Sequence, residues 1–139
     1  MEVNVEQELN TDCKKVWEVI TNPDQMKNWF FENIPDFKAE VGFKTEFPVH
    51  TGERIFTHLW EIKDVIPGSK IVYDWRYKEY EGIGEVIFKL NDTDSGCNIR
   101  VTHSGLDTFS DEIPEFSEES CRGGWNYFIK DRLKNYLNT

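Results

Sequence analysis

The chain has 139 residues, which is enough for one compact domain with a substantial core. Acidic residues outnumber basic residues by 26 to 16, and the formal net charge of −10 makes nucleic acids and anionic membrane surfaces poor partners. No apolar run approaches the roughly 20 residues that cross a bilayer, and the N-terminal residues do not resemble a signal peptide. We therefore expect a soluble, cytoplasmic protein that forms a single domain over residues 1–139.

The first thirty residues predict a strand followed by two helices. Residues 3–9 alternate between apolar and polar side chains, as in a half-buried strand. Asp12 can cap a helix that ends near Asn22, and Pro23 can begin a second, shorter helix. The apolar residues of the two helices are Cys13, Val16, Trp17, Ile20, Met26, Trp29 and Phe30.

From about residue 37 to residue 104 the pattern changes to period two, with turn residues between the apolar runs. Such short turns join strands that are antiparallel neighbours. The sequence therefore predicts strands over 43–50, 54–65, 70–77, 83–91 and 97–104, with a short additional strand near 36–40.

An acidic stretch from Asp107 to Glu119 follows the last predicted strand. We expect a solvated loop rather than a docking surface. Its three apolar residues, Phe109, Ile113 and Phe116, could close an internal hollow as a lid or simply anchor the loop.

Apolar residues at helical spacing predict a long terminal helix over about 115–137, with Trp125 in its buried stripe. Gly123 and Gly124 interrupt this helix, although an interior glycine costs roughly 1 kcal/mol relative to alanine. Without a Cβ atom, these residues let the helix approach the sheet closely or leave a hollow beside Trp125. We favour close packing, and the alternative is a kink that lets the first half of the helix move.

The three cysteines, Cys13, Cys97 and Cys121, are odd in number and lack metal-type spacing. We expect three reduced, partly buried thiols rather than a redox or zinc site. No other pattern indicates a metal or a cofactor, and we expect neither.

Three parts of the chain resemble a known family when they are taken together. Residues 12–30, "DCKKVWEVITNPDQMKNWF", resemble its opening helix pair, and residues 65–75, "VIPGSKIVYDW", resemble its proline turn and a strand that ends in tryptophan. The stretches "VTHSGL" (101–106) and "GGW" (123–125) resemble its last strand and helix. Over essentially its whole length, the chain resembles the family of activator of heat-shock-chaperone ATPase homologues, within the START-related SRPBCC superfamily.

The resemblance implies an α+β helix-grip fold, in which a curved antiparallel sheet wraps around a long C-terminal helix. Relatives have a hollow between the sheet and the helix, and many use it for apolar ligands. The aromatic content of 14% agrees with a cavity lined by rings. The residues that the family's alignment directs inward are Phe56, His58, Trp60 and Ile62, then Ile71, Tyr73, Trp75 and Tyr77, then Val86, Phe88 and Leu90, and finally Ile99, Val101 and His103.

His103 is the first candidate for a polar role, because it alternates with Ile99 and Val101 on an otherwise apolar face. In a hollow its imidazole could bind the carbonyl or phenol of a ligand. A structural histidine bonded to the backbone is the alternative that we favour. His58 presents the same choice, and His50 is expected in a surface turn.

We expect a binding protein for a small apolar or aromatic molecule, such as a lipid, a polyketide-like compound or a planar aromatic. The alternative, implied by the resemblance, is an interaction protein that regulates a heat-shock chaperone ATPase. No nucleophile accompanies Asp74 or Glu46, so we do not expect an enzyme of the cyclase or hydrolase kind. The expected ligand-binding residues are Phe47, His58, Trp60, Tyr73, Trp75, His103, Phe116 and Trp125.

Overall fold

The computed structural model describes residues 2–137. The chain begins with β1 (Glu2–Leu9), α1 (Cys13–Thr21) and α2 (Pro23–Met26). Five further strands follow: β2 (Lys44–Thr51), β3 (Arg54–Ile66), β4 (Lys70–Tyr77), β5 (Tyr80–Thr93) and β6 (Gly96–Ser104). Two 3-10 turns, η1 (Leu106–Thr108) and η2 (Pro114–Phe116), lead to a terminal helix with three parts: α3 (Glu118–Trp125), the π-helical η3 (Asn126–Leu133) and α4 (Lys134–Leu137).

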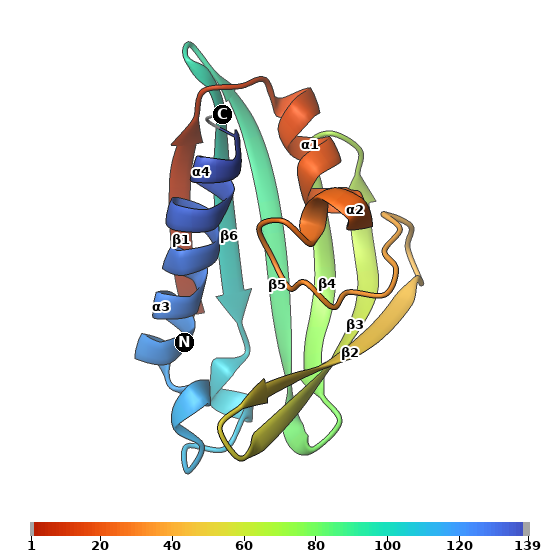
Figure 1. Cartoon of the computed structure of the whole chain (residues 1–139), viewed down its shortest axis with the longest axis vertical. Helices are drawn as coiled ribbons and strands as arrows, with labels where there is room; N and C mark the ends of the chain where they lie inside the picture. The colour runs from red at the N-terminus through yellow and green to blue at the C-terminus, as the bar shows by residue number, and fades with distance from the viewer. Residues whose placement is uncertain (1, 138–139) are drawn as a thin grey trace.

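The six strands form one open, curved antiparallel sheet in the order β1–β6–β5–β4–β3–β2. The terminal helix packs along β1 and β6, while α1 and α2 cover the other end of the same sheet face (Figure 1). The hairpin of β2 and β3 extends across the lower part of the molecule in this view (Figure 1). This arrangement is the helix-grip fold that the resemblance implied, and the prediction of fold class is confirmed.

The alternation of side chains places the expected residues on the covered face of the sheet. The inward residues of β3, β5 and β6 are no more than 5% exposed, and those of β4 are buried except for the half-buried Tyr77. Among them, His58 and His103 are only 5% and 3% exposed. Trp125 of the terminal helix is 4% exposed, as predicted. The period-two pattern grouped these residues on one face of each strand, and the family resemblance correctly directed that face inward.

Three predicted boundaries are wrong, and one of them is the start of β5, which is Tyr80 rather than residue 83. Residues 36–40 form a loop rather than a strand, because Gly42 and Phe43 take the hydrogen bonds of Ile62 at the edge of β3. The terminal helix begins at Glu118 rather than near residue 115, because residues 114–116 form a separate 3-10 turn. Ser117 then caps the helix, and its side chain accepts a hydrogen bond from the Ser120 N–H at 3.1 Å.

The expectation of three reduced thiols is also wrong. Cys13 and Cys97 form a disulfide, with their Cα atoms 5.0 Å apart, and only Cys121 is free. The two partners are 84 residues apart in the sequence, so their spacing gave no indication of the pairing. They meet because β1 pairs with β6 with Leu9 opposite Cys97, and α1 begins four residues after Leu9. The disulfide ties the first helix to the sheet.

The strand β2 lies at one edge of the sheet. It contains the exposed Pro48, opposite Thr57 of β3, and proline has no N–H to donate to a ladder. The carbonyl of Pro48 accepts a hydrogen bond from the side chain of Asn33, in the loop that follows α2.

Candidate ligand-binding pocket

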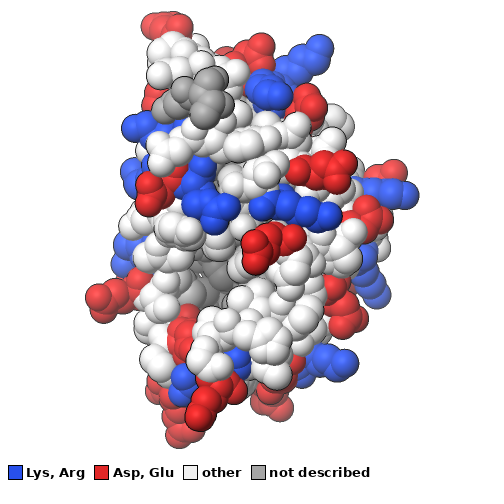
Figure 2. Space-filling model, viewed as in Figure 1, with Lys and Arg blue, Asp and Glu red and all other residues white. Residues whose placement is uncertain are grey.

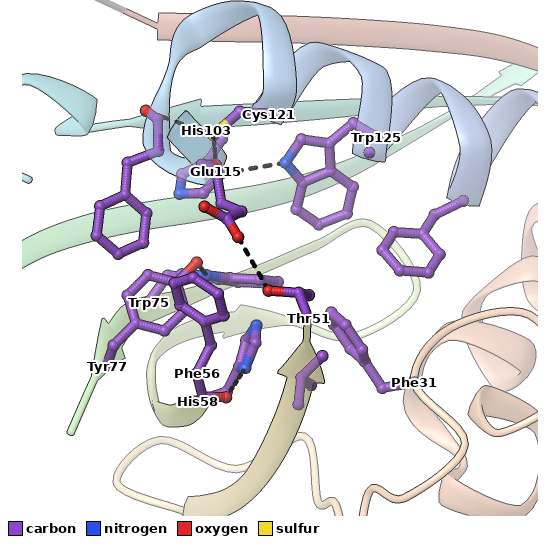
Figure 3. Close-up of a pocket in the computed structure, with 14 residues that line it drawn as sticks. Phe31, Thr51, Phe56, His58, Trp75, Tyr77, His103, Glu115, Cys121 and Trp125 are labelled. Atoms are coloured by element: carbon purple, nitrogen blue, oxygen red, sulfur yellow. Dashed lines mark hydrogen bonds between the residues drawn. The ribbon is translucent and has the colours of Figure 1, made fainter. Parts of the chain in front are cut away.

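A pocket of about 230 Å³ lies between the sheet and the terminal helix, near the tip of the β2–β3 hairpin (Figure 3). Strands β3 and β4 supply one wall, and α3 with the start of η3 supplies the opposite wall. Seven of the fourteen lining residues carry Phe, Tyr or Trp rings. The lining residues are Phe31, Val49, Thr51, Phe56, His58, Trp75, Tyr77, His103, Glu115, Phe116, Cys121, Gly124, Trp125 and Phe128.

The structure brings together five of the eight residues expected to bind a ligand. These are His58, Trp75, His103, Phe116 and Trp125.

The other three, Phe47, Trp60 and Tyr73, lie outside this lining and are 2%, 1% and 1% exposed in the packed core. Phe47 stacks on His58 with 5.1 Å between ring centroids, so it supports the pocket wall from behind. The family resemblance directed Trp60 and Tyr73 toward the interior, but it does not show which interior positions face empty space.

Nine lining residues were not expected. Phe56 and Tyr77 were on the predicted inward faces, so the sequence carried a signal for them. No such signal marked the loop residue Phe31 or the Thr51–Glu115 pair, because their positions depend on how loops fold back over the sheet. The remaining four are Val49, Cys121, Gly124 and Phe128.

The expectation of close packing at the two glycines is wrong. A Cβ atom built on Gly123 or Gly124 would meet no atom within 4 Å. Gly123 is exposed, whereas Gly124 lines the pocket. The absent side chain at Gly124 therefore contributes to the hollow beside Trp125, which is the other effect that the sequence suggested.

His103 is fixed in the wall of the pocket by Trp125. The indole Nε1–H of Trp125 donates to His103 Nδ1 at 3.1 Å, so the proton of the neutral ring is on Nε2 (Figure 3). This Nε2 is buried and has no hydrogen-bond partner within residues 2–137. Burial, together with the nearby His58, lowers the pKa of His103 from 6.5 to about 4, so the ring is neutral at pH 7.

His58 has the opposite tautomer. Its Nδ1–H donates to the backbone carbonyl of Phe56 at 2.9 Å, which leaves Nε2 as a hydrogen-bond acceptor. In Figure 3 this second nitrogen points away from the Phe56 carbonyl and toward the space below Thr51. Burial lowers the pKa of His58 from 6.5 to about 4, against the smaller opposing effects of the Phe56 carbonyl and the Glu79 charge.

Two other polar groups of the lining remain protonated. The hydroxyl of Tyr77 accepts a hydrogen bond from Trp75 Nε1 at 2.7 Å, and burial raises the pKa of Tyr77. Burial also raises the pKa of the Cys121 thiol to about 11. A thiol with this pKa is a poor nucleophile at neutral pH.

A polar bridge crosses the mouth of the pocket. Thr51, at the end of β2, donates a hydrogen bond to Glu115 Oε2 at 3.0 Å (Figure 3). Arg54, at the start of β3, lies 3.3 Å from the Oε1 atom of the same carboxylate. Burial opposes ionisation of Glu115, but hydrogen bonds from its own backbone and from Thr51, with the charge of Arg54, lower its pKa overall. The bridge joins the β2–β3 hairpin to η2.

The acidic stretch forms a cover beside this bridge. Phe109 and Phe116 are buried against Phe56 of β3, while Asp107, Asp111 and Glu112 are exposed. Figure 2 shows acidic side chains gathered at the lower end of the molecule, where Figure 1 places the segments between β6 and α3. Within the described part of the chain, no helix is both long enough and apolar enough to span a membrane.

The curved sheet, the terminal helix and the pocket between them define a member of the helix-grip class. The model of the family described as "Activator of Hsp90 ATPase homolog 1-like protein" matches residues 10–138. The chain belongs to this family. Comparison with curated proteins gives no significant match.

Solved structures with the same fold cover almost the whole chain. Protein MLL2253 from Mesorhizobium loti is 23% identical with a TM-score of 0.79, over 99% of this chain and 97% of that one. Protein BH1534 from Bacillus halodurans is 24% identical with a TM-score of 0.77, over 99% of this chain and 96% of that one. The Aha1 dimer from Colwellia psychrerythraea is 17% identical with a TM-score of 0.75, over 99% of this chain and 96% of that one. At these identities, the similarity establishes the fold.

Proposed function

We propose that this protein binds a small apolar or aromatic molecule in the pocket between the sheet and the terminal helix. The observation that carries the proposal is the lining of seven aromatic rings around about 230 Å³ of space. Pockets for small molecules are mostly apolar with a few placed polar groups, and this lining matches that description.

The polar groups of the pocket support binding more than catalysis. Both histidines are neutral at pH 7, and the one cysteine of the lining is protonated. His103 is already bonded to Trp125, and His58 to the backbone of Phe56. These groups are suited to orient a ligand, as the residues of a binding protein do.

The two glycines provide a matched test. Gly124→Leu would place a side chain in the pocket, whereas Gly123→Leu would place the same side chain on the exposed surface one residue earlier in the same helix. Both substitutions replace a helical glycine, so their effects on helix propensity are similar. We expect compounds that bind the wild type to lose binding in Gly124→Leu and to retain it in Gly123→Leu.

Binding is measured by thermal shift and by tryptophan fluorescence, since Trp75 and Trp125 line the pocket. A panel of planar aromatics, polyketide-like compounds and lipids should contain at least one ligand with an affinity tighter than about 100 µM. Binding that is unchanged in Gly124→Leu would place the ligand elsewhere, and a panel without any ligand would refute the proposal.

Regulation of a chaperone ATPase is a second candidate function. It is favoured by the family match, whose description names an activator of the Hsp90 ATPase. The test is the ATPase rate of purified Hsp90 with and without this protein. Stimulation that is equal for the wild type and Gly124→Leu would support this function and would separate it from pocket binding, whereas no stimulation and no complex in a pull-down would refute it.

A further inference from the structure

Two neighbouring groups in the pocket have hydrogen-bonding capacity that no described residue uses. His58 Nε2 is an acceptor, because its ring proton is on Nδ1 and is donated to the Phe56 carbonyl. Tyr77 accepts from Trp75 Nε1 but has no acceptor for its own hydroxyl proton among residues 2–137. The two rings are adjacent, with centroids 4.9 Å apart. The pocket thus presents an acceptor beside a donor.

Few ligand groups satisfy such a pair. A carbonyl or ether oxygen accepts hydrogen bonds but cannot donate to His58, whereas a hydroxyl both donates and accepts. Leaving either protein group without a partner after the ligand has displaced water would weaken binding. A hydroxyl group matches both His58 and Tyr77 with one atom.

The charges around the pocket select against anions. No lysine or arginine is among the lining residues. Glu115 stands at the mouth, and Arg54 is already paired with it. A carboxylate or phosphate would therefore be buried without a positive partner, which is unfavourable. The seven rings of the lining suit flat aromatic ligands, because rings stack or meet edge to face.

From this geometry we infer that the ligand is a neutral aromatic molecule with a hydroxyl group, held by His58 Nε2 and the Tyr77 hydroxyl. The inference rests on the proposed function and specifies the chemical class that the same pocket selects.

Four probes of similar shape test this selection: naphthalene, 2-naphthol, 2-methoxynaphthalene and 2-naphthoate. At pH 7 the first three are neutral and the last is an anion. Affinities for the wild-type protein are measured by isothermal titration calorimetry. We expect 2-naphthol to bind most tightly, with the methyl ether and the carboxylate each roughly tenfold weaker or more.

Two substitutions test whether His58 and Tyr77 are the residues that bind the hydroxyl group. His58→Phe keeps an aromatic ring but removes the acceptor, and it should abolish the preference for naphthol over its methyl ether. His50→Phe is the matched control, because His50 is an exposed residue of β2 outside the lining. Tyr77→Phe removes the donor, so it should weaken 2-naphthol and 2-methoxynaphthalene alike relative to naphthalene and leave the preference between the two unchanged.

The outcomes separate this inference from the function on which it rests. Equal affinity of the wild type for naphthol and its methyl ether would overturn the inference but leave apolar binding intact. A preference that persists in a folded His58→Phe variant would also overturn it. No binding of any of the four probes would also overturn the inference, and the wider panel of aromatics, polyketide-like compounds and lipids would then decide the proposed function. If His58→Phe does not fold, the affinities of the wild-type protein for the four probes still test the inference.

Discussion

The two ends of the interior are built from the same kinds of side chain but are covered differently. At the end covered by α1 and α2, Trp29 and Phe30 stack with centroids 4.6 Å apart and are 0% and 3% exposed. At the other end, the cover consists of η2 and the part of α3 that contains Gly124, and a pocket remains.

The comparison shows that aromatic residues alone do not create a pocket. The ring centroids of Trp60 and Trp75 are 5.2 Å apart, yet of the two residues only Trp75 lines the pocket under the terminal helix. What differs is the element above each ring: the segment after α2 fills the space at one end, and a glycine leaves it open at the other. The hollow is a property of the cover more than of the sheet.

The largest expected effect contrasts two tryptophans under the same substitution. Trp29→Ala should reduce the free energy of unfolding by about 3–5 kcal/mol, because Trp29 is fully buried and its Nε1–H donates to the Val19 carbonyl. Trp125→Ala should cost about 1–2 kcal/mol less than Trp29→Ala, because one side of the Trp125 ring already faces the pocket, although the substitution also removes the donor to His103 Nδ1. Urea denaturation measures both, and equal losses would contradict the contrast between packed and hollow ends.

Reduction of the disulfide should have the next largest effect. The Cys13–Cys97 bond closes a long loop, and removing such a constraint typically costs about 2–4 kcal/mol. We expect a lower melting temperature with dithiothreitol and in Cys13→Ser, and no such change in Cys121→Ser. Identical melting curves with and without the reductant would show that the bond does not contribute.

The buried histidines predict a loss of stability in mild acid. Because burial lowers their folded-state pKa to about 4 from 6.5, the unfolded chain takes up these protons first as the pH falls. Stability should therefore fall between about pH 6.5 and pH 4, by on the order of 3 kcal/mol for each histidine.

The measurement is the free energy of unfolding against pH for the wild type, His58→Phe and the surface control His50→Phe. His58→Phe should have a shallower slope in this window, and His50→Phe should retain the wild-type slope. A wild-type curve that is flat from pH 6.5 to pH 4 would contradict the neutral, buried state of the two rings.

The smallest expected effect comes from alanine at the glycine pair. Gly123→Ala and Gly124→Ala should each stabilise the protein by about 0.5–1 kcal/mol, because neither new Cβ meets an atom within 4 Å. Only Gly124→Ala should also weaken ligand binding. Thermal melts and a binding titration separate the two effects, and a destabilising Gly124→Ala would indicate that the position is packed after all.

Alternation over β3 to β6 was sufficient to group the residues of each strand face, because it depends only on local order, and the family resemblance supplied the fold and the inward direction of those faces. The sequence also indicated that Trp125 is buried. It was not sufficient to distinguish Trp60 and Tyr73, which fill the core, from Trp75, which lines the pocket. That distinction depends on what lies above each ring, and period-two spacing contains no information about the opposite layer.

The other contacts that the sequence did not predict have the same origin. The Cys13–Cys97 bond and the link between Thr51 and Glu115 join residues 84 and 64 positions apart in the sequence. Both depend on how one loop or helix end is placed against a distant strand. Local patterns predict secondary structure and faces, whereas contacts at this range are set by the three-dimensional arrangement.

Pro48 has a consequence for aggregation. One strand of the hairpin that borders the pocket, β2, lies at an edge of the sheet. An unprotected edge can pair with a strand from another molecule. Pro48 removes one donor from that edge, and Asn33 occupies its carbonyl. Any outward movement of the hairpin that admitted a ligand would expose an edge with an interrupted ladder. The β2 edge is therefore a poor template for an intermolecular β-sheet.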